Sequence, residues 1–301
     1  MLKAQNAKII ESYGGFNMKS VRFSRRIFLV AIPTAALIIT GCGAGKTGSD
    51  NWDETVKGVK WTIKDKGNGT ARLTGFDRSG KEPSGNIKLP TEVDGLKITS
   101  MVDGEKNGSS LFKGCEKLTG VCVPSSYRRI GNKAFQQCSK LKTVVVEDGV
   151  RQIGEYAFGE CSSLSSLTLP SSIGIIEKYA FSDCSSLTEV QIPDDTEEVG
   201  KAAFVRCASL KKAYIPLNMR VLGIFAFNEC DELTDVYYEG TPDELKKIER
   251  DDPSAGTSTK WKTSYGFSLD FSNLEFKSDA GSKEFVNTTF HYEVPLSEYL
   301  K

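Results

Sequence analysis

The sequence predicts a strand-rich α/β protein built as a solenoid of 23-residue coils, with capping elements at both ends. Three residue types each recur every 23 residues between Leu111 and Tyr238. A fixed period of this length is the signature of stacked repeats, in which each coil buries its apolar face only against its neighbours. The columns are Cys115, Cys138, Cys161, Cys184, Cys207 and Cys230; Phe112, Phe135, Phe158, Phe181, Phe204 and Phe227; and Leu118, Leu141, Leu164, Leu187, Leu210 and Leu233.

Composition and charge weigh against nucleic-acid binding, histidine-based catalysis and His-rich metal sites. Of 301 residues, 39% are hydrophobic and 26% charged, as in soluble globular proteins. The formal net charge is zero, with a net +5 in residues 1–41 and a net −5 in the remainder. A nucleic-acid partner would favour a basic face, and none is predicted. The single histidine, His291, weighs against histidine-based catalysis and His-rich metal sites.

The amino terminus has the features of an export signal. Residues 19–26 are basic and residues 27–40 are nearly all apolar. At roughly 14 residues this run suits a signal peptide better than a membrane span. It ends in Ile39-Thr40-Gly41-Cys42, which resembles the lipobox of bacterial lipoproteins. The resemblance implies cleavage before Cys42 and lipid attachment to its thiol, while an ordinary signal peptide with a chance cysteine is the alternative.

The export route and the start residue each have two interpretations. Ser24-Arg25-Arg26-Ile27-Phe28-Leu29 resembles a twin-arginine export motif, but the same residues suit the general secretory route. Met18 is an alternative start to Met1. We therefore expect a signal peptide over residues 1–41, a small polar tether over 42–51, and a folded domain after it.

Residues 52–110 predict an amino-terminal cap and a degenerate first coil. Alternating runs flank Asn68-Gly69 within residues 56–76, a strong hairpin signal. Short strands follow at 86–90 and 93–98, and residues 103–110 read as an inserted loop. Solenoids need such an end to cover the apolar face of their first coil.

Within residues 111–238 the coils follow L-x-x-V-x-I-P, then an apolar pair, then glycine, then Ala-Phe, with Glu147 and Glu239 in place of proline and Ala213 in place of valine. The Leu, Val and Ile point inward, and proline ends the strand because it cannot donate to a ladder bond. Glycine after the apolar pair permits a sharp bend or a positive φ, and Glu177 is the exception. The small alanine beside the large phenylalanine lets successive coils nest.

The cysteine column admits a chemical and a structural interpretation. Thiolate metal sites need ligands that converge on a point, whereas one cysteine per coil forms a line. Disulfides between adjacent coils are possible by spacing. Six identical positions in register favour packing, since a free cysteine behaves as a small buried hydrophobe.

The motif I-G-x-x-A-F-x-x-C-x-x-L-x-x-V-x-I-P resembles the BspA-type leucine-rich repeat of bacterial surface proteins. The resemblance is strong over residues 111–238. It implies a right-handed leucine-rich-repeat solenoid, secreted or displayed at the cell surface, with a role in adhesion or protein binding. The family has no common catalytic residues to carry over.

The solvent side of the strand ladder is the candidate binding face. Solenoids commonly bind partners across such a regular face, and Tyr214 and Tyr237 are expected to be adjacent there. The alternative is that tyrosine is simply a good strand residue. The candidate binding residues are Val145, Thr168, Gln191, Tyr214, Tyr237, Glu189 and Lys212.

Residues 239–301 predict a carboxyl-terminal cap with an insertion at 251–283. Thr241, Pro242 and Glu244 form a helix start with a capping box. Residues 284–292 read as a closing strand, in which His291 is more typical of a structural residue than of a ligand. Residues 265–276 are aromatic-rich and suit a hairpin.

Together these features favour a non-enzymatic lipoprotein that presents a leucine-rich-repeat face to a protein or host-surface ligand outside the cytoplasm. An envelope scaffold without a high-affinity ligand is the alternative. We expect no catalytic residues, no metal and no cofactor, because no nucleophile–base pair or carboxylate dyad stands out. The expected partners are a protein ligand and the membrane, through the lipid anchor.

Overall fold

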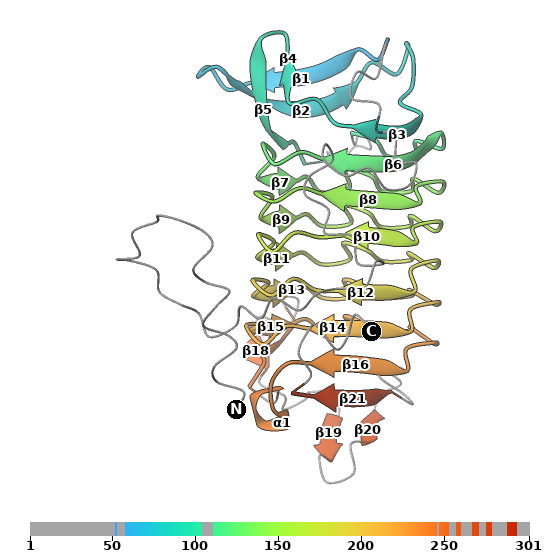
Figure 1. Ribbon diagram of the computed structural model, residues 1–301, viewed down its shortest axis with the longest axis vertical. Coiled ribbons are helices and arrows are strands. Elements are labelled where there is room, and N and C mark those ends of the chain that lie inside the picture. The colour runs from blue at the N-terminus through green and yellow to red at the C-terminus, as the bar shows by residue number, and fades with distance from the viewer. Residues whose placement is uncertain are drawn as a thin grey trace, which may run out of the picture. The chain divides into compact units, whose positions relative to one another are not determined.

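The computed structural model describes residues 52, 58–103, 111–245, 247–252, 257–259, 267–270, 275–278 and 288–293 (Figure 1). The signal peptide and tether expected over residues 1–51, with Cys42, lie outside the described residues. In the part that is described, the chain forms the predicted solenoid of 23-residue coils, with almost no helix.

Each coil contributes one main strand, and each coil but the last also contributes one two-residue strand; these strands form two ladders that run along the stack (Figure 1). Successive strands pair in parallel with a register of 23 residues, as in Val190↔Ala213 and Ile176↔Val199. The main strands are β6 (Leu118–Val123), β8 (Thr143–Val146), β10 (Ser166–Thr168), β12 (Glu189–Gln191), β14 (Lys212–Ile215) and β16 (Asp235–Tyr238). The short strands are β7 (Arg129–Ile130), β9 (Gln152–Ile153), β11 (Ile175–Ile176), β13 (Glu198–Val199) and β15 (Val221–Leu222). We number the coils 1 to 6 by the main strand that opens each, from β6 to β16.

The main ladder consists of two sheets, with strand orders β10-β8-β6-β3 and β12-β14-β16-β21. β3 (Gly85–Lys88) extends it at the amino-terminal end and β21 (Thr289–Tyr292) at the carboxyl-terminal end. β10 and β12 are not paired with each other, and Leu167 and Leu169 are only half-buried there. The short strands form one continuous sheet in the order β15-β13-β11-β9-β7, so the stack is unbroken on that side.

The remaining side of each coil is a tight turn with two non-glycine residues at positive φ. In coil 2 these are Tyr156 (φ 53°) and Glu160 (φ 61°), and the same two positions recur in coils 1 to 5. Such a conformation is strained for residues with a Cβ. It directs the N–H groups to the next coil: Tyr156 N donates to Lys178 O at 3.3 Å and Glu160 N to Ser182 O at 2.7 Å. The turn side is therefore a third line of hydrogen bonds between coils.

The phenylalanine column forms the centre of the core. All six rings are fully buried and stack in nearly parallel planes, with centroid distances of 4.8–5.4 Å from Phe112 to Phe227. The adjacent alanines are also fully buried. The stack continues into the amino-terminal cap, where the rings of Phe76 and Trp61 lie 5.9 and 6.1 Å from that of Phe112.

The cysteine column has the structural role that its spacing favours. All six thiols are free and buried. From Cys138 onward, each thiol donates to the carbonyl oxygen of the phenylalanine 26 residues earlier; Cys184 Sγ, for example, lies 3.3 Å from Phe158 O. Burial raises the pKa of the Cys184 thiol well above its ordinary value, which keeps it protonated as a donor.

The glycine column allows neighbouring coils to approach each other closely. Its glycines do not have the positive φ that was the alternative reason for glycine at this position. Gly131, Gly154, Gly200 and Gly223 are absent from the positive-φ residues. A Cβ at Gly223 would lie 2.3 Å from Lys201 N, and one at Gly131 would lie 2.0 Å from Val102 O. The neighbouring coil passes too near for a side chain, which explains the preference for glycine.

The amino-terminal cap is a four-stranded sheet in the order β1-β2-β5-β4. β1 (Trp61–Asp65) and β2 (Thr70–Phe76) pair antiparallel and form the hairpin expected around Asn68-Gly69. β5 (Leu96–Met101) pairs parallel with β2 and antiparallel with β4 (Glu92–Val93). Ala71, Leu73, Ile98 and Met101 bury their side chains against the first coil.

At the carboxyl-terminal end, different segments extend the two ladders. β21 closes the main ladder, as expected for residues 284–292, of which 289–292 form the strand. Residues 247–249 follow the short helix α1 (Pro242–Leu245) and continue the second ladder, where Glu249 N donates to Arg220 O at 2.8 Å. Two hairpins follow: β17 (Arg250–Asp252) with β18 (Thr257–Thr259), and β19 (Phe267–Asp270) with β20 (Glu275–Ser278). The second overlaps the hairpin expected over 265–276 and extends to Ser278.

Candidate functional site

The solvent side of β12 and β14 brings three of the predicted binding residues together, and Thr168 lies on β10, across the break in the main ladder. Glu189 and Lys212 are directly opposite each other in register, and Gln191 follows two residues after Glu189 on the same face. Glu189 and Gln191 are exposed, while Thr168 and Lys212 are half-buried. Among the described residues these four side chains form no hydrogen bond or ion pair. We call this set the strand-face patch.

Two predicted binding residues are not exposed, which corrects the expectation for that face. Tyr214 is fully buried, with its hydroxyl 3.4 Å from both Asp194 Oδ1 and Glu239 Oε2. Burial, reinforced by these two carboxylates, raises the pKa of Tyr214. Val145 is only 6% exposed and lies in register beside the buried Cys122. Side chains that alternate outward along a strand can still be covered by their neighbours, which strand periodicity does not reveal.

Tyr237, the last predicted binding residue, lies at the carboxyl end of the ladder against β21. Its ring stacks on that of His291 at 4.5 Å and 13°. His291 Nε2 lies 2.7 Å from Asp235 Oδ1, and this hydrogen bond lowers the pKa of Asp235. His291 is therefore part of the closing strand, as expected, and the Tyr214–Tyr237 pair does not form an exposed aromatic patch.

On the second ladder, the glycine exception Glu177 joins three coils. Its Oε1 accepts hydrogen bonds from Arg129 Nη2 at 3.1 Å and from Gln152 Nε2 at 2.6 Å, and its Oε2 accepts one from Glu155 N at 2.9 Å. The carboxylate supplies acceptors for donors in the two preceding coils. This arrangement stabilises the stack.

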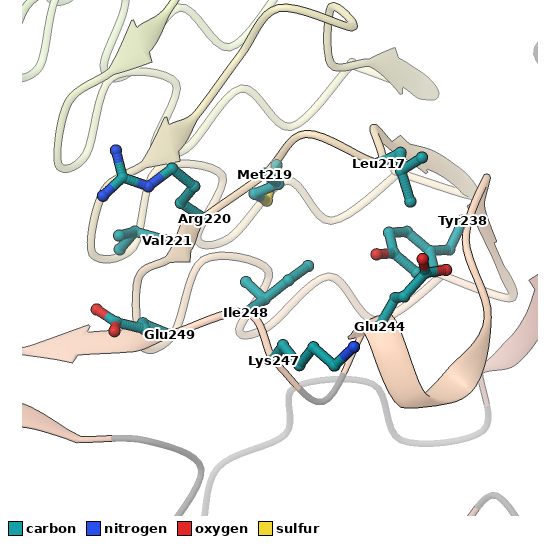
Figure 2. Close-up of a pocket in the computed structure, with 9 residues that line it drawn as sticks. All are labelled: Leu217, Met219, Arg220, Val221, Tyr238, Glu244, Lys247, Ile248 and Glu249. Atoms are coloured by element: carbon teal, nitrogen blue, oxygen red, sulfur yellow. The ribbon is translucent and has the colours of Figure 1, made fainter.

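A hollow of about 420 Å³ lies between coil 5 and α1 (Figure 2). Leu217, Met219 and Ile248 form its apolar wall. Glu244 also lines it, but its Oε2 accepts hydrogen bonds from Thr241 N at 2.8 Å and Thr241 Oγ1 at 3.1 Å. These bonds lower the pKa of Glu244 and form the predicted capping box. The hollow is thus the seam where the cap meets the last coils.

Among the residues that the structure describes, no group of three or more His, Cys, Asp or Glu side chains is placed to hold a metal ion. No described helix has the length and apolar character needed to span a bilayer.

Comparisons with known proteins agree on the repeat. Residues 105–248 match the model of the BspA type leucine rich repeat region, in six copies. A leucine-rich-repeat protein of T. pallidum is 30% identical, with 59% of this chain and 78% of that one covered and a TM-score of 0.53. A leucine-rich-repeat protein of Bacteroides ovatus is 27% identical, with 62% and 47% covered and a TM-score of 0.52. No curated protein matches the chain.

Proposed function

Because the chain belongs to the BspA-type leucine-rich-repeat family, we propose that it is a non-enzymatic binding protein of the bacterial surface. In this proposal Cys42 carries the lipid anchor outside the cytoplasm and the tether 42–51 separates the solenoid from the membrane. The strand-face patch contacts a protein or host-surface ligand. The lipobox residues and the family support the location, and the patch supports the binding role.

One observation carries the binding role. Glu189, Gln191 and Lys212 present polar groups on a rigid ladder, yet they form no hydrogen bond or ion pair with any described residue. The inward columns hold the coils together, so the fold does not require these outward side chains. The ladder fixes the backbone of these residues, and their side-chain polar groups are available to a ligand that orders them at a cost of about 0.5–1.5 kcal/mol each.

A binding experiment with matched variants tests the patch. Immobilised chain is exposed to individual purified extracellular host proteins, and affinity is measured by surface plasmon resonance. We expect saturable binding to at least one, weakened tenfold or more when Glu189, Gln191 and Lys212 are all replaced by alanine, since two lost hydrogen bonds of about 1 kcal/mol each already exceed the roughly 1.4 kcal/mol that corresponds to tenfold.

The control variant replaces Glu197 and Arg220 by alanine. These two residues directly precede β13 and β15 and form an exposed ion pair (3.1 Å), and the variant should bind like the parent. Equal affinity in the patch variant would exclude the strand face as the binding surface. Absence of any saturable partner would favour the alternative, an envelope scaffold. Lipid attachment is tested separately by intact mass: the Cys42→Ser variant should lack the acyl mass that the parent carries.

A further inference from the structure

A hollow of about 550 Å³ lies where the amino-terminal cap meets the second ladder. The cap strand β5 lies beside β7, and Arg128 N donates to Thr99 O at 3.0 Å, so β5 continues the line of the short strands (Figure 1). The lining comes from β5, from the corner after β6 and from the residues before β7 and β9. Its charged side chains are the basic Lys97, Arg128 and Arg151 and the acidic Glu92.

The three basic side chains of this hollow are exposed. Within the part of the chain that the structure describes, the side chains of Lys97, Arg128 and Arg151 form no hydrogen bond or ion pair. A fourth cation lies at the edge, where Lys66 Nζ donates to Thr99 Oγ1 at 2.6 Å. The chain after residue 41 carries a net −5, so this concentration of positive charge is a local feature.

The nearby carboxylates do not neutralise the hollow. Glu92 is opposite Lys97 in register, and it is the one acidic side chain in the lining. Glu147 Oε2 accepts a hydrogen bond from Ser125 N at 3.0 Å, but Lys88 Nζ pairs with Glu147 Oε1 at 3.2 Å. With three positive side chains and one negative, the lining keeps a net charge of +2.

The repeat shows that the fold does not require two arginines here. Arg128 and Arg151 occupy the same position in adjacent coils, and Arg151 N donates to Arg128 O at 2.9 Å. Like charges in directly opposite strand positions are destabilising. In coils 4 and 5 the same position holds Glu197 and Arg220, which form an ion pair at 3.1 Å. Coil 3 has Gly174 there, which offers no side chain to pair with Arg151.

We propose that this hollow is a binding site for a phosphate group. Guanidinium groups from adjacent coils, whose backbones are about 4.8 Å apart, can bind different oxygens of one tetrahedral phosphate. A carboxylate has only two oxygens, which a single guanidinium already satisfies, so it would use the arginine pair less fully. Lys97 and the exposed Ser125 hydroxyl supply further donors.

The charge of the ligand also agrees with the lining. A phosphomonoester carries about −1.5 to −2 charges near neutral pH, against the net +2 of the hollow. Inorganic phosphate in solution and the headgroup of an anionic phospholipid both present this group, and the experiment below separates these two sources. The site is independent of the strand-face patch, so either proposal can fail without the other.

The repeat supplies a matched pair of variants. Arg128→Glu lowers the net charge of the hollow from +2 to zero and recreates, with Arg151, the Glu–Arg order that coils 4 and 5 use. Arg220→Glu makes the same change of charge at the same coil position, outside the hollow, and leaves two glutamates opposite each other. Binding and stability should therefore respond in opposite directions in the two variants.

The test titrates the full chain with inorganic phosphate in a calorimeter at low ionic strength, because salt screens exposed charges. A second arm compares sedimentation with phosphatidylglycerol and with phosphatidylcholine vesicles, and the latter measures insertion of the apolar amino terminus. We expect saturable phosphate binding, or stronger binding to phosphatidylglycerol than to phosphatidylcholine. This binding should weaken about tenfold or more in Arg128→Glu and stay unchanged in Arg220→Glu. Binding of phosphate in solution assigns the free anion, and binding confined to vesicles assigns the headgroup.

Urea melts separate binding from folding. The midpoint of Arg128→Glu should equal or exceed that of the parent, and the midpoint of Arg220→Glu should be lower. A lower midpoint in Arg128→Glu would make the arginine pair structural and overturn the proposal. It is also overturned if neither probe binds, if Arg128→Glu binds like the parent, or if acetate binds as tightly as phosphate.

Discussion

Replacing Phe181 with alanine tests the phenylalanine column at its centre. Phe181 is fully buried, and its ring centroid lies 5.3 Å from that of Phe158 and 5.2 Å from that of Phe204. Truncating a buried phenylalanine costs about 3–5 kcal/mol. Two lost ring contacts of about 0.5–1.5 kcal/mol each favour the upper half of that range. Because folded domains are stable by about 5–15 kcal/mol, the variant should lose a quarter or more of its free energy of unfolding.

Urea unfolding followed by circular dichroism measures this loss, from the midpoint and the slope of the transition. In a solenoid each coil contacts only its neighbours, so a cavity in coil 3 weakens the coupling between the two halves of the stack. We therefore expect a lower midpoint and also a smaller slope, as the halves begin to unfold separately. Phe225→Ala, a half-buried aromatic on the turn side, is the control and should cost about 1–2 kcal/mol.

The result that would refute this reasoning is a loss below about 1 kcal/mol, or a loss no larger than that of Phe225→Ala. Either outcome would mean that the ring column does not hold the coils together. A large loss with an unchanged slope would retain the core assignment but contradict the expected uncoupling of the two halves.

Three further predictions follow from the same contacts. The cysteine column should react with a disulfide reagent at pH 8 only after unfolding, because burial suppresses the thiolate; rapid reaction of the native column would contradict this. Glu177→Gly, which restores the repeat glycine, should cost about 1–3 kcal/mol in urea melts by depriving Arg129 and Gln152 of their acceptor, and a neutral or stabilising effect would contradict the bridging role. The lowered pKa of Asp235 stabilises the fold above the ordinary value of 3.8, and this stability is lost as the pH falls below it. The Asp235→Asn variant weakens the contact with His291, so its urea midpoint should fall less between pH 5 and pH 3 than that of the parent. An equal fall in both proteins would show that Asp235 does not contribute to acid unfolding.

The candidate binding residues show that sequence periodicity predicts the direction of a side chain but not its exposure. Alternation along a strand assigns Glu189, Gln191 and Tyr214 to the same face, and the structure agrees about the direction. It cannot say that Tyr214 is buried between two carboxylates while Gln191 is exposed, since coverage depends on the side chains of adjacent coils. The pairing of Tyr237 with His291 likewise joins residues 54 positions apart, through the closing strand.

The conformation of the turn side of the coils could not be predicted from the sequence. Tyr156, Gln136 and Glu160 occupy variable positions of the repeat, and none of them belongs to a recognised motif. The positive φ at Tyr156 and Glu160 was also unexpected, because that conformation usually selects glycine or asparagine. Here the hydrogen bond of each N–H to the next coil holds the conformation, and that bond exists only once the coils are stacked.

The sequence by itself determined the 23-residue coil, the buried columns and the structural role of the cysteines, because a fixed period forces equivalent residues into equivalent surroundings. Only the tertiary structure decided how neighbouring coils meet. It made the glycines sites of close approach and Glu177 a bridge. It also buried Tyr214. The physical reason is that these properties depend on contacts between neighbouring coils, and the spacing of residues along the sequence does not specify how far apart the atoms of two coils lie.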